Sequence, residues 1–289
     1  TKYFGMYDNV TFPMPETFYD DYETRGSAVR TQKMSVTKDM RWEQDFKVPE
    51  MLDTANADSW DSYLSLMNEV NRMNPEQRIA WGKYYFPRNR RLLEARLTGK
   101  ELDEWKYQNY IRDYMSVIKS VDESVGRVLD YLDSHGLTDN TIIVYTSDQG
   151  FYMGEHGWFD KRFMYEESLR TPLLIAYPGH IQPGTVCNKL VQNIDYAPTF
   201  LDLAGISKPK ELPGRSLTPL FKAGDKVKGW RNSIYYHYYD YPSYHMVRKH
   251  DGVRTDRYKL IHFYGAGGLD AVKENKYQRQ PGTREHGCM

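Results

Sequence analysis

A long apolar stripe between residues 101 and 136 constrains the fold of this chain more than any other feature. The side chains that form it recur at steps of three and four residues: Tyr107, Tyr110, Ile111, Tyr114, Val117, Ile118, Val121, Val125, Val128, Leu129 and Leu132. Residues at these spacings lie on one face of a helix. The sequence therefore predicts one long amphipathic helix from Glu101 to Gly136, with acidic residues near its start and a glycine at its end.

Two short apolar runs follow this helix. The runs Thr141–Thr146 and Pro172–Pro178 are rich in apolar residues and do not alternate with polar ones, which is typical of strands buried on both faces of a sheet. A short helix around Met164–Leu169 lies between them, and a strand-like segment Leu190–Ile194 precedes a helix Tyr196–Ala204. Strands and helices in this order predict an α/β fold, with helices covering the faces of a sheet.

The two ends of the chain differ from its middle in their residue patterns. Residues 1–60 are turn-rich and predict extended loop with one short helix, whereas residues 61–96 predict helix broken at Pro75 and Pro87. From about Trp230 the residue pattern predicts a small C-terminal antiparallel sheet with one solvent-exposed face, built from Ser233–Tyr239 and Gly252–Tyr264. Residues 266–289 are polar and lack periodicity, so we expect a loose tail.

Composition excludes some classes of protein. The chain has 39 basic and 39 acidic residues among 289, and this balance argues against a nucleic-acid partner, which needs a basic excess. No run approaches the roughly 20 apolar residues that a membrane span requires. The start, Thr1–Gly5, has no signal-peptide layout, and we expect that it lies in the middle of a longer protein. A disulfide between Cys187 and Cys288 is left open.

The loop from Ser147 to Lys161 carries the residues most suited to chemistry. Asp148 follows an expected strand, and ligands of α/β sheets bind at the carboxyl ends of strands. Its carboxylate and the Gln149 amide oxygen are hard donors that suit Ca²⁺ or Mg²⁺. The positive charge of Lys161, later in the same loop, could hold an oxyanion. The alternative interpretation is an ordinary turn with Lys161 as a surface lysine, since short Asp/Gly motifs recur by chance.

Several motifs in order favour the first interpretation. Thr146–Gly150 followed by Gly154–Gly157 and a lysine resembles the second metal-binding motif of the formylglycine-dependent sulfatases, which belong to the alkaline-phosphatase superfamily. The flanking segments resemble the family in the same order: Val121–Arg127, Tyr165–Leu173, Asp195–Thr199 and Leu212–Leu217. Within the family, Tyr22–Gly26 and Tyr235–Arg254 resemble bacterial mucin-desulfating or N-acetylglucosamine-6-sulfatases.

The resemblance implies a fold and a site. It implies an α/β alkaline-phosphatase-like sheet with flanking helices in residues 1–228, the start of a small C-terminal sheet domain in 229–265 and the tail in 266–289. Asp148 and Gln149 would be ligands of one divalent cation, usually Ca²⁺, and Lys161 would contact the sulfate oxygens. For His156 in the same loop, packing is the favoured role over direct acid or base catalysis.

The family's nucleophile segment is absent from this chain. Sulfatases oxidise a Cys or Ser within Cys/Ser-x-Pro/Ala-x-Arg to formylglycine, and neither Cys187 nor Cys288 has that context. The pair Asp20–Asp21 lies in a turn-rich region rather than after an apolar strand, so we interpret it as unrelated to the metal aspartates. Because covalent catalysis needs an activated nucleophile, the isolated chain is expected to be inactive and to need a missing N-terminal half. The resemblance implies a periplasmic or secreted protein.

The substrate implied by the resemblance is a sulfated sugar, with N-acetylglucosamine-6-sulfate of mucin or glycosaminoglycan as the first candidate. Aromatic and charged residues between Tyr235 and Arg254 suit a sugar, and we predict that His245, Arg248 and Arg254 contact it; an ordinary surface sheet is the alternative. Two other functions stay open: a phosphodiesterase or phosphonate hydrolase of the same superfamily, and an inactive fragment. Gln149 in place of a histidine favours one metal, and thus the sulfatase.

Overall fold

A computed structural model describes residues 2–241 and 243–264 of the chain. The predicted tail 266–289 and Cys288 lie outside the described residues, while Cys187 is exposed and forms no disulfide with a described residue. The chain divides into two units. The first unit holds residues 1–20, 34–161 and 165–186, and the second holds 21–33, 162–164 and 187–289. The predicted domain boundary after residue 228 stays a prediction.

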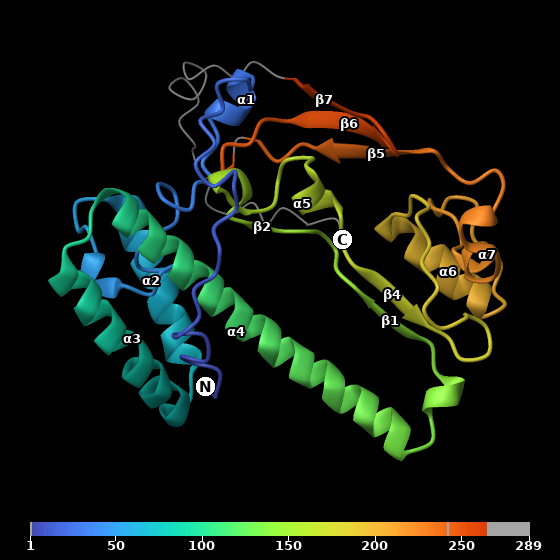
Figure 1. The fold of residues 1–289 in the computed structure, drawn as a ribbon, viewed down its shortest axis with the longest axis horizontal. Helices are drawn as coiled ribbons and strands as arrows, with labels where there is room; N and C mark the ends of the chain where they lie inside the picture. The colour runs from blue at the N-terminus through green and yellow to red at the C-terminus, as the bar shows by residue number, and fades with distance from the viewer. Residues whose placement is uncertain (1, 242, 265–289) are drawn as a thin grey trace. The chain divides into compact units, whose positions relative to one another are not determined.

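Helices dominate the first unit (Figure 1). They are α2 (Ala57–Arg72), α3 (Pro75–Ala95), α4 (Gly99–Ser134) and α5 (Glu166–Leu169). The long helix predicted from the apolar stripe is confirmed as α4, within two residues at each end. The turn-rich start is also confirmed: before α2 begins at Ala57, the described residues hold one short α-helix, α1 (Ser27–Arg30), which belongs to the second unit. Among the described residues, no helix carries an apolar stretch long enough to cross a membrane.

The first half of α4 is covered by the turn-rich N-terminal segment. Its apolar residues Tyr107 and Ile111 are buried in a core with Phe18, Phe46 and Phe159. Burying each such side chain contributes about 1.5–3 kcal/mol. Because the covering segment has little regular structure of its own, this apolar contact holds it against the helix.

The predicted break at Pro87 is wrong. Helix α3 begins at Pro75, as expected, but continues through Pro87 to Ala95. An interior proline costs about 3 kcal/mol because it removes a hydrogen bond and clashes with the preceding turn. Trp81 and Leu92, on either side of Pro87, are both buried, and their burial offsets that cost. Tertiary packing therefore overrides the local preference.

The two apolar runs form the strands β1 (Ile143–Thr146) and β4 (Leu173–Ala176). They pair antiparallel, with Val144 opposite Ile175. The prediction that they are buried on both faces is wrong for this chain, because 44% of Tyr145 and 59% of Leu174 is exposed. Among the described residues these strands form a sheet of two, so each keeps a free edge and lacks the neighbouring strands that would be needed to bury it.

A small hairpin lies between these strands in the sequence. It consists of β2 (Tyr152–Met153) and β3 (Phe159–Asp160), joined by the single turn η3 (Glu155–Gly157). The hairpin is fixed to the covering segment, because Phe159 N donates to Met34 O and Val36 N donates to Gly157 O, both at 2.9 Å. The buried Trp158 lies between those two bonds. The loop predicted to carry the chemistry is thus held in place by its own backbone.

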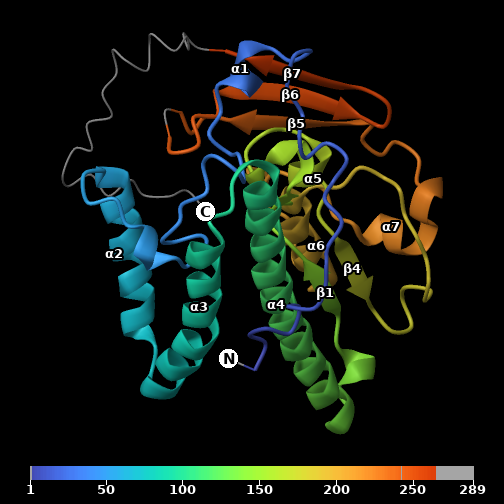
Figure 2. The same cartoon turned by 60° about the vertical axis from the view of Figure 1, so that its left-hand side comes forward.

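The second unit contains the predicted C-terminal antiparallel sheet, which is confirmed. Its strands are β5 (Ser233–Tyr238), β6 (His250–Thr255) and β7 (Lys259–Phe263), in that order. Half-buried and exposed residues alternate along β5 and β7, as expected for a sheet with one solvent-exposed face. Figure 2 shows this sheet from the side, with β6 in the middle.

The remaining helices of the second unit are α6 (Tyr196–Leu203) and α7 (Thr218–Ala223). The strand expected over Leu190–Ile194 is absent from the described structure, where a short turn η4 (Asn193–Asp195) precedes α6 instead. The cause is Asp195, which is fully buried. Its carboxylate accepts from Gln192 N at 2.8 Å and from Arg231 Nη2 at 2.6 Å, and these bonds favour a turn over an extended strand.

Candidate functional site

Asp148 lies just beyond the end of β1, as predicted. The chain turns there because Ser147 Oγ donates to Gln149 O at 2.8 Å, and Thr146 Oγ1 donates to Pro172 O at 2.9 Å. The first bond closes a local turn of the kind that serine often makes. The Asp148 side chain is exposed, so its carboxylate is open to a ligand rather than used in packing.

Gln149 joins the two charged residues of the predicted site. With its amide nitrogen toward Asp148, the side chain donates to Asp148 Oδ2 at 3.2 Å and its oxygen accepts from Lys161 Nζ at 3.2 Å. Asp148, Gln149 and Lys161 are therefore brought together, although Lys161 follows Asp148 by 13 positions in the sequence. The cluster combines a carboxylate, an amide oxygen and an ammonium group.

The hairpin β2–β3 delivers Lys161 to this position. Asp160 immediately before it has a positive φ of 67°, which redirects the chain as it leaves β3. Lys161 Nζ lies 3.7 Å from Asp160 Oδ1 and 6.0 Å from the centre of the Phe151 ring. Because 36% of the side chain is exposed, the ammonium group can still meet an anion from solvent.

Helix α5 abuts the turn that holds the site. Gly150 N donates to Ser168 O at 2.7 Å, and a Cβ at Gly150 would lie only 1.9 Å from the carbonyl oxygen of Glu167. Only glycine permits so close an approach of the two backbones. The glycine after Gln149 is thus required by packing, and its contact with α5 fixes the direction of the Asp148–Gln149 turn.

His156 links three segments around the site. Its Nδ1 lies 3.1 Å from Asp20 Oδ2, its Nε2 lies 3.9 Å from Glu167 Oε1, and its backbone N donates to Thr17 Oγ1 at 3.0 Å. The imidazole also contacts the Tyr165 ring, with the ring centres 5.3 Å apart. The hairpin that carries Lys161 is thereby tied to the helix that abuts Gly150, and these contacts support a packing role for His156.

Sequence reasoning did not find the partners of His156. In the structure Asp20 lies beside the His156 imidazole, 136 residues away in the sequence. Neither Asp20 nor Glu167 belongs to a motif that predicts a contact with His156. Only the path of the covering segment over the hairpin brings them to His156.

Replacing His156 by alanine is expected to lower the free energy of unfolding by about 1–3 kcal/mol, because Asp20 and Glu167 each lose a partner in a mostly buried setting. The free energy of unfolding of His156→Asn should lie between those of His156→Ala and the unmodified chain, since asparagine keeps a donor and tolerates the positive φ of 57° found here. Urea denaturation of the chain measures both. His135→Ala, which changes an exposed histidine at the end of α4, is the control; an equal loss there would contradict the role given to His156.

The three residues predicted to contact sugar lie in the second unit. His245 is buried, and its Nδ1 lies 3.0 Å from Lys33 O. Arg248 Nη1 donates to Ser27 Oγ at 3.2 Å. Arg254 lies near the other end of β6, paired with Ile234 of β5. The structure thus brings His245 and Arg248 to the same segment but does not bring Arg254 to it, and contact with sugar stays a prediction.

The oxygen donors of Asp148 and Gln149 meet only part of what a divalent cation requires. Asp148 and Gln149 together offer oxygen donors of the kind that Ca²⁺ prefers, but Ca²⁺ takes about 6–8 oxygens. Within residues 2–241 and 243–264, no group of three or more His, Cys, Asp or Glu side chains could hold a metal ion. The residues present therefore fit one side of a cation's shell and not the whole of it.

The chain is similar to known proteins of one family. The model of the sulfatase family matches residues 13–206, and that of the N-sulphoglucosamine sulphohydrolase C-terminal region matches residues 154–276. The chain is 46% identical over 268 residues to an N-acetylglucosamine-6-O-sulfatase of Bacteroides thetaiotaomicron. The match covers 91% of this chain and 47% of that protein, so the chain spans about half the length of this relative.

Solved structures agree. The chain superposes with a TM-score of 0.83 and 44% identity on BT4656, determined in complex with its substrate D-glucosamine-2-N,6-O-disulfate, covering 94% of this chain and 56% of that one. A phosphonate monoester hydrolase from Silicibacter pomeroyi matches less well, with a TM-score of 0.50 and 27% identity over 55% of this chain and 34% of that one. The predicted α/β fold of the alkaline-phosphatase type is confirmed, and the chain belongs to the sulfatase family.

Proposed function

We propose that this chain is part of a sulfuric ester hydrolase that removes sulfate from the 6-position of a glucosamine-type sugar. The observation that carries the proposal is the cluster of Asp148, Gln149 and Lys161, found in a chain of the sulfatase family. A carboxylate and an amide oxygen suit a hard cation, and the neighbouring ammonium group suits an oxyanion. Sulfate esters present such an oxyanion.

The nature of the sugar rests on two relatives. One is named an N-acetylglucosamine-6-O-sulfatase, and the other holds D-glucosamine-2-N,6-O-disulfate as its substrate. Both names share a glucosamine ring with a 6-O-sulfate. We propose the same group for the protein to which this chain contributes, as part of mucin or glycosaminoglycan, with His245, Arg248 and Arg254 as candidate contacts to the sugar. A periplasmic or secreted location is proposed from the family resemblance alone.

In this proposal Asp148 and Gln149 hold one divalent cation, with Ca²⁺ favoured by their hard oxygen donors. A bound cation would withdraw charge from the sulfate oxygens. Lys161 supplies a second positive charge that would stabilise the oxygens as the ester bond breaks. Gln149 lies between Asp148 and Lys161, with its amide nitrogen toward the carboxylate and its oxygen toward the ammonium group. Ligation of a cation beside Asp148 therefore requires the amide to rotate and present its oxygen there.

The attacking group of a sulfatase, formylglycine, is expected in polypeptide that this chain lacks. The proposal therefore needs a complementing N-terminal half, in keeping with the 47% of the Bacteroides relative that the chain spans. That half would bring the nucleophile and the remaining cation ligands. The isolated chain binds at most part of the substrate and is expected to be inactive.

The test measures sulfate release from N-acetylglucosamine-6-sulfate. The chain is assayed alone and after mixing with the part of the Bacteroides relative outside the matched 268 residues, produced separately with its nucleophile converted to formylglycine. We expect no release by the chain alone and release by the mixture. A chelator should abolish that release and added Ca²⁺ should restore it, because the complete site needs its cation.

Two outcomes would change the assignment. Efficient release by the chain alone would overturn the expected inactivity. Hydrolysis of a phosphonate monoester by the mixture, without release of sulfate, would favour the phosphonate hydrolase instead. The separately produced part assayed alone is the control, because any activity there would not involve Lys161 or Asp148.

A further inference from the structure

The chain directly after Lys161 is held by the C-terminal sheet. The segment Arg162–Met164 follows Lys161 in the sequence and belongs to the second unit together with β5, β6 and β7. Within this segment, Phe163 and Met164 are completely buried, with 0% of each exposed. The backbone is thus fixed immediately beyond the lysine that is proposed to act on the sulfate.

The segment contacts all three strands of the sheet. The Tyr236 hydroxyl of β5 donates to Arg162 O at 3.2 Å. The Phe163 ring stacks on His250 of β6, with ring centres 6.1 Å apart. The same ring meets Phe263 of β7 at an angle of 69°, with ring centres 6.0 Å apart. Contacts from three strands therefore converge on two consecutive residues.

Gly252 of β6 makes room for the third residue of the segment. A Cβ at Gly252 would lie 2.4 Å from Met164 Sδ and 2.4 Å from Leu260 O, so only glycine fits at this position. Tyr236 lies opposite Gly252 in the register of β5 and β6, and paired residues project to the same face of a sheet. The hydroxyl that holds Arg162 and the space that holds Met164 are therefore parts of one surface.

Tyr236 is well placed to act as a hydrogen-bond donor. Its ring stacks on that of His250, with ring centres 5.6 Å apart and planes at 28°. His250 is fully buried, and its Nδ1 donates to Arg248 O at 2.8 Å. Burial raises the pKa of Tyr236 to about 12. The hydroxyl therefore keeps its proton at neutral pH and donates to Arg162 O.

We propose that Tyr236 is a positioning residue for Lys161, acting through the carbonyl group of Arg162. This role rests on the proposed function, in which Lys161 stabilises charge on the sulfate oxygens. Before Lys161 the chain is fixed by β3, which ends at Asp160, and after it by the bond from Tyr236 to Arg162. A lysine whose backbone is fixed on both sides presents its ammonium group at one place, as stabilisation of developing charge requires.

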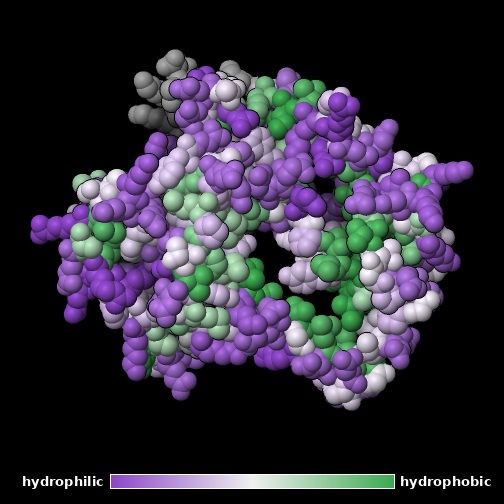
Figure 3. Space-filling model, in the orientation of Figure 1, coloured by the Kyte–Doolittle hydropathy of each residue, from purple (hydrophilic) through white to green (hydrophobic). Residues whose placement is uncertain are grey.

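The neighbouring Tyr235 offers a matched control. It lies on the same strand but on the opposite face, and 59% of it is exposed. That outer face is open to solvent although it is not wholly polar, since Figure 3 shows hydrophobic side chains over β6 and β7, and 68% of Leu260 is exposed. Tyr235→Phe and Tyr236→Phe therefore remove the same hydroxyl group from the two faces of one sheet.

The first measurement is sulfate release by the complemented enzyme, which is the chain mixed with the separately produced part of the Bacteroides relative. Tyr236→Phe should lower kcat by about threefold to tenfold, the scale of one neutral hydrogen bond. KM should change little, because Lys161 acts on charge that develops as the ester bond breaks. Combined with Lys161→Ala, Tyr236→Phe should have no further effect, since its role passes through Lys161. Tyr235→Phe should match the unmodified enzyme.

The second measurement does not need catalysis. Trypsin cleaves after lysine and arginine, and cleavage after Lys161 or Arg162 requires this segment to leave the sheet. In the chain alone, Tyr236→Phe should accelerate that cleavage by about threefold or more, whereas Tyr235→Phe should not. Mass spectrometry identifies the fragments, and thermal unfolding checks that both variants fold.

An unchanged kcat in Tyr236→Phe, or a loss of kcat that persists in the Lys161→Ala background, would overturn the positioning role. Without any release of sulfate by the complemented enzyme the proposed function fails, and the cleavage rates then decide the rest. Faster cleavage in Tyr236→Phe would leave the hold of Tyr236 on Arg162 standing, and equal cleavage in the two variants would refute it.

Discussion

Replacing Lys161 by alanine is expected to lower kcat/KM for sulfate release by about 100- to 1,000-fold in the complemented enzyme. This is the usual effect of removing one group that stabilises developing negative charge. Lys161 Nζ is held 3.2 Å from the Gln149 amide oxygen and remains accessible to an anion. Lys161→Arg keeps the charge but changes its geometry, so an intermediate rate is expected. Steady-state kinetics on N-acetylglucosamine-6-sulfate measure both variants.

The matched control is Lys83→Ala, which removes an exposed lysine from α3. Its kcat/KM should equal that of the unmodified enzyme. An unchanged kcat/KM in Lys161→Ala would contradict its role and leave the ordinary surface-lysine interpretation.

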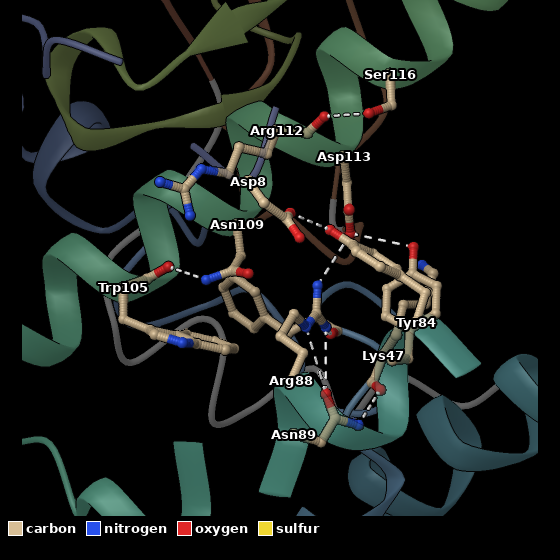
Figure 4. Close-up of polar contacts among 12 residues, drawn as sticks. Asp8, Lys47, Tyr84, Arg88, Asn89, Trp105, Asn109, Arg112, Asp113 and Ser116 are labelled. Carbon is tan, nitrogen blue, oxygen red and sulfur yellow. Dashed lines mark hydrogen bonds and ion pairs between the residues drawn. The ribbon is translucent and has the colours of Figure 1, made fainter. Parts of the chain in front are cut away.

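Replacing Arg88 by methionine is expected to lower the free energy of unfolding by about 2–4 kcal/mol, the scale of breaking a mostly buried ion pair by removing one partner. Figure 4 shows the Arg88 guanidinium between Asp113 and Asn89. Its Nη1 donates to Asp113 Oδ2 at 3.4 Å, its Nη2 donates to Phe46 O, and the group lies 4.6 Å from the centre of the Tyr85 ring. Because 27% of the Asp113 side chain is exposed, the loss should fall below that of a fully buried pair.

The loss should depend on pH. Burial raises the pKa of Asp113, and the Arg88 guanidinium opposes that rise. Without Arg88 the pKa of Asp113 rises further, so the ionised carboxylate costs most at neutral pH. A raised carboxyl pKa means that stability is greatest below the unfolded pKa and falls as pH rises through the folded pKa. The difference between Arg88→Met and the unmodified chain should therefore shrink as pH is lowered.

Urea denaturation at several pH values measures this difference. The double variant Arg88→Met with Asp113→Asn should recover part of the lost stability at neutral pH, since it removes the uncompensated charge. Lys119→Met is the control, because Lys119 pairs with Asp122 on the exposed surface of α4 at 2.7 Å and such pairs contribute little. A loss in Arg88→Met that is independent of pH would show that packing of the arginine stem, rather than the ion pair, stabilises this region.

Local patterns were sufficient for much of the fold. The spacing of apolar residues predicted α4, and the uninterrupted apolar runs predicted β1 and β4, because periodicity reflects which face of an element is buried. The same patterns failed at Pro87 and at Leu190–Ile194. At Pro87 distant packing outweighed a local cost, and before α6 the buried carboxylate of Asp195 formed bonds that the sequence pattern does not reveal.

The sequence by itself determined the family and made Asp148, Gln149 and Lys161 the candidate site residues, since they lie within one loop and their order is a property of the chain. Only the tertiary structure decided how Gln149 bridges the two charges, that Gly150 lies against Glu167, and that Asp20 contacts His156. It also showed that Tyr145 and Leu174, in strands expected to be buried, are largely exposed. The physical reason is that burial and side-chain contacts depend on which distant segments pack together, whereas a motif records only what is adjacent along the chain.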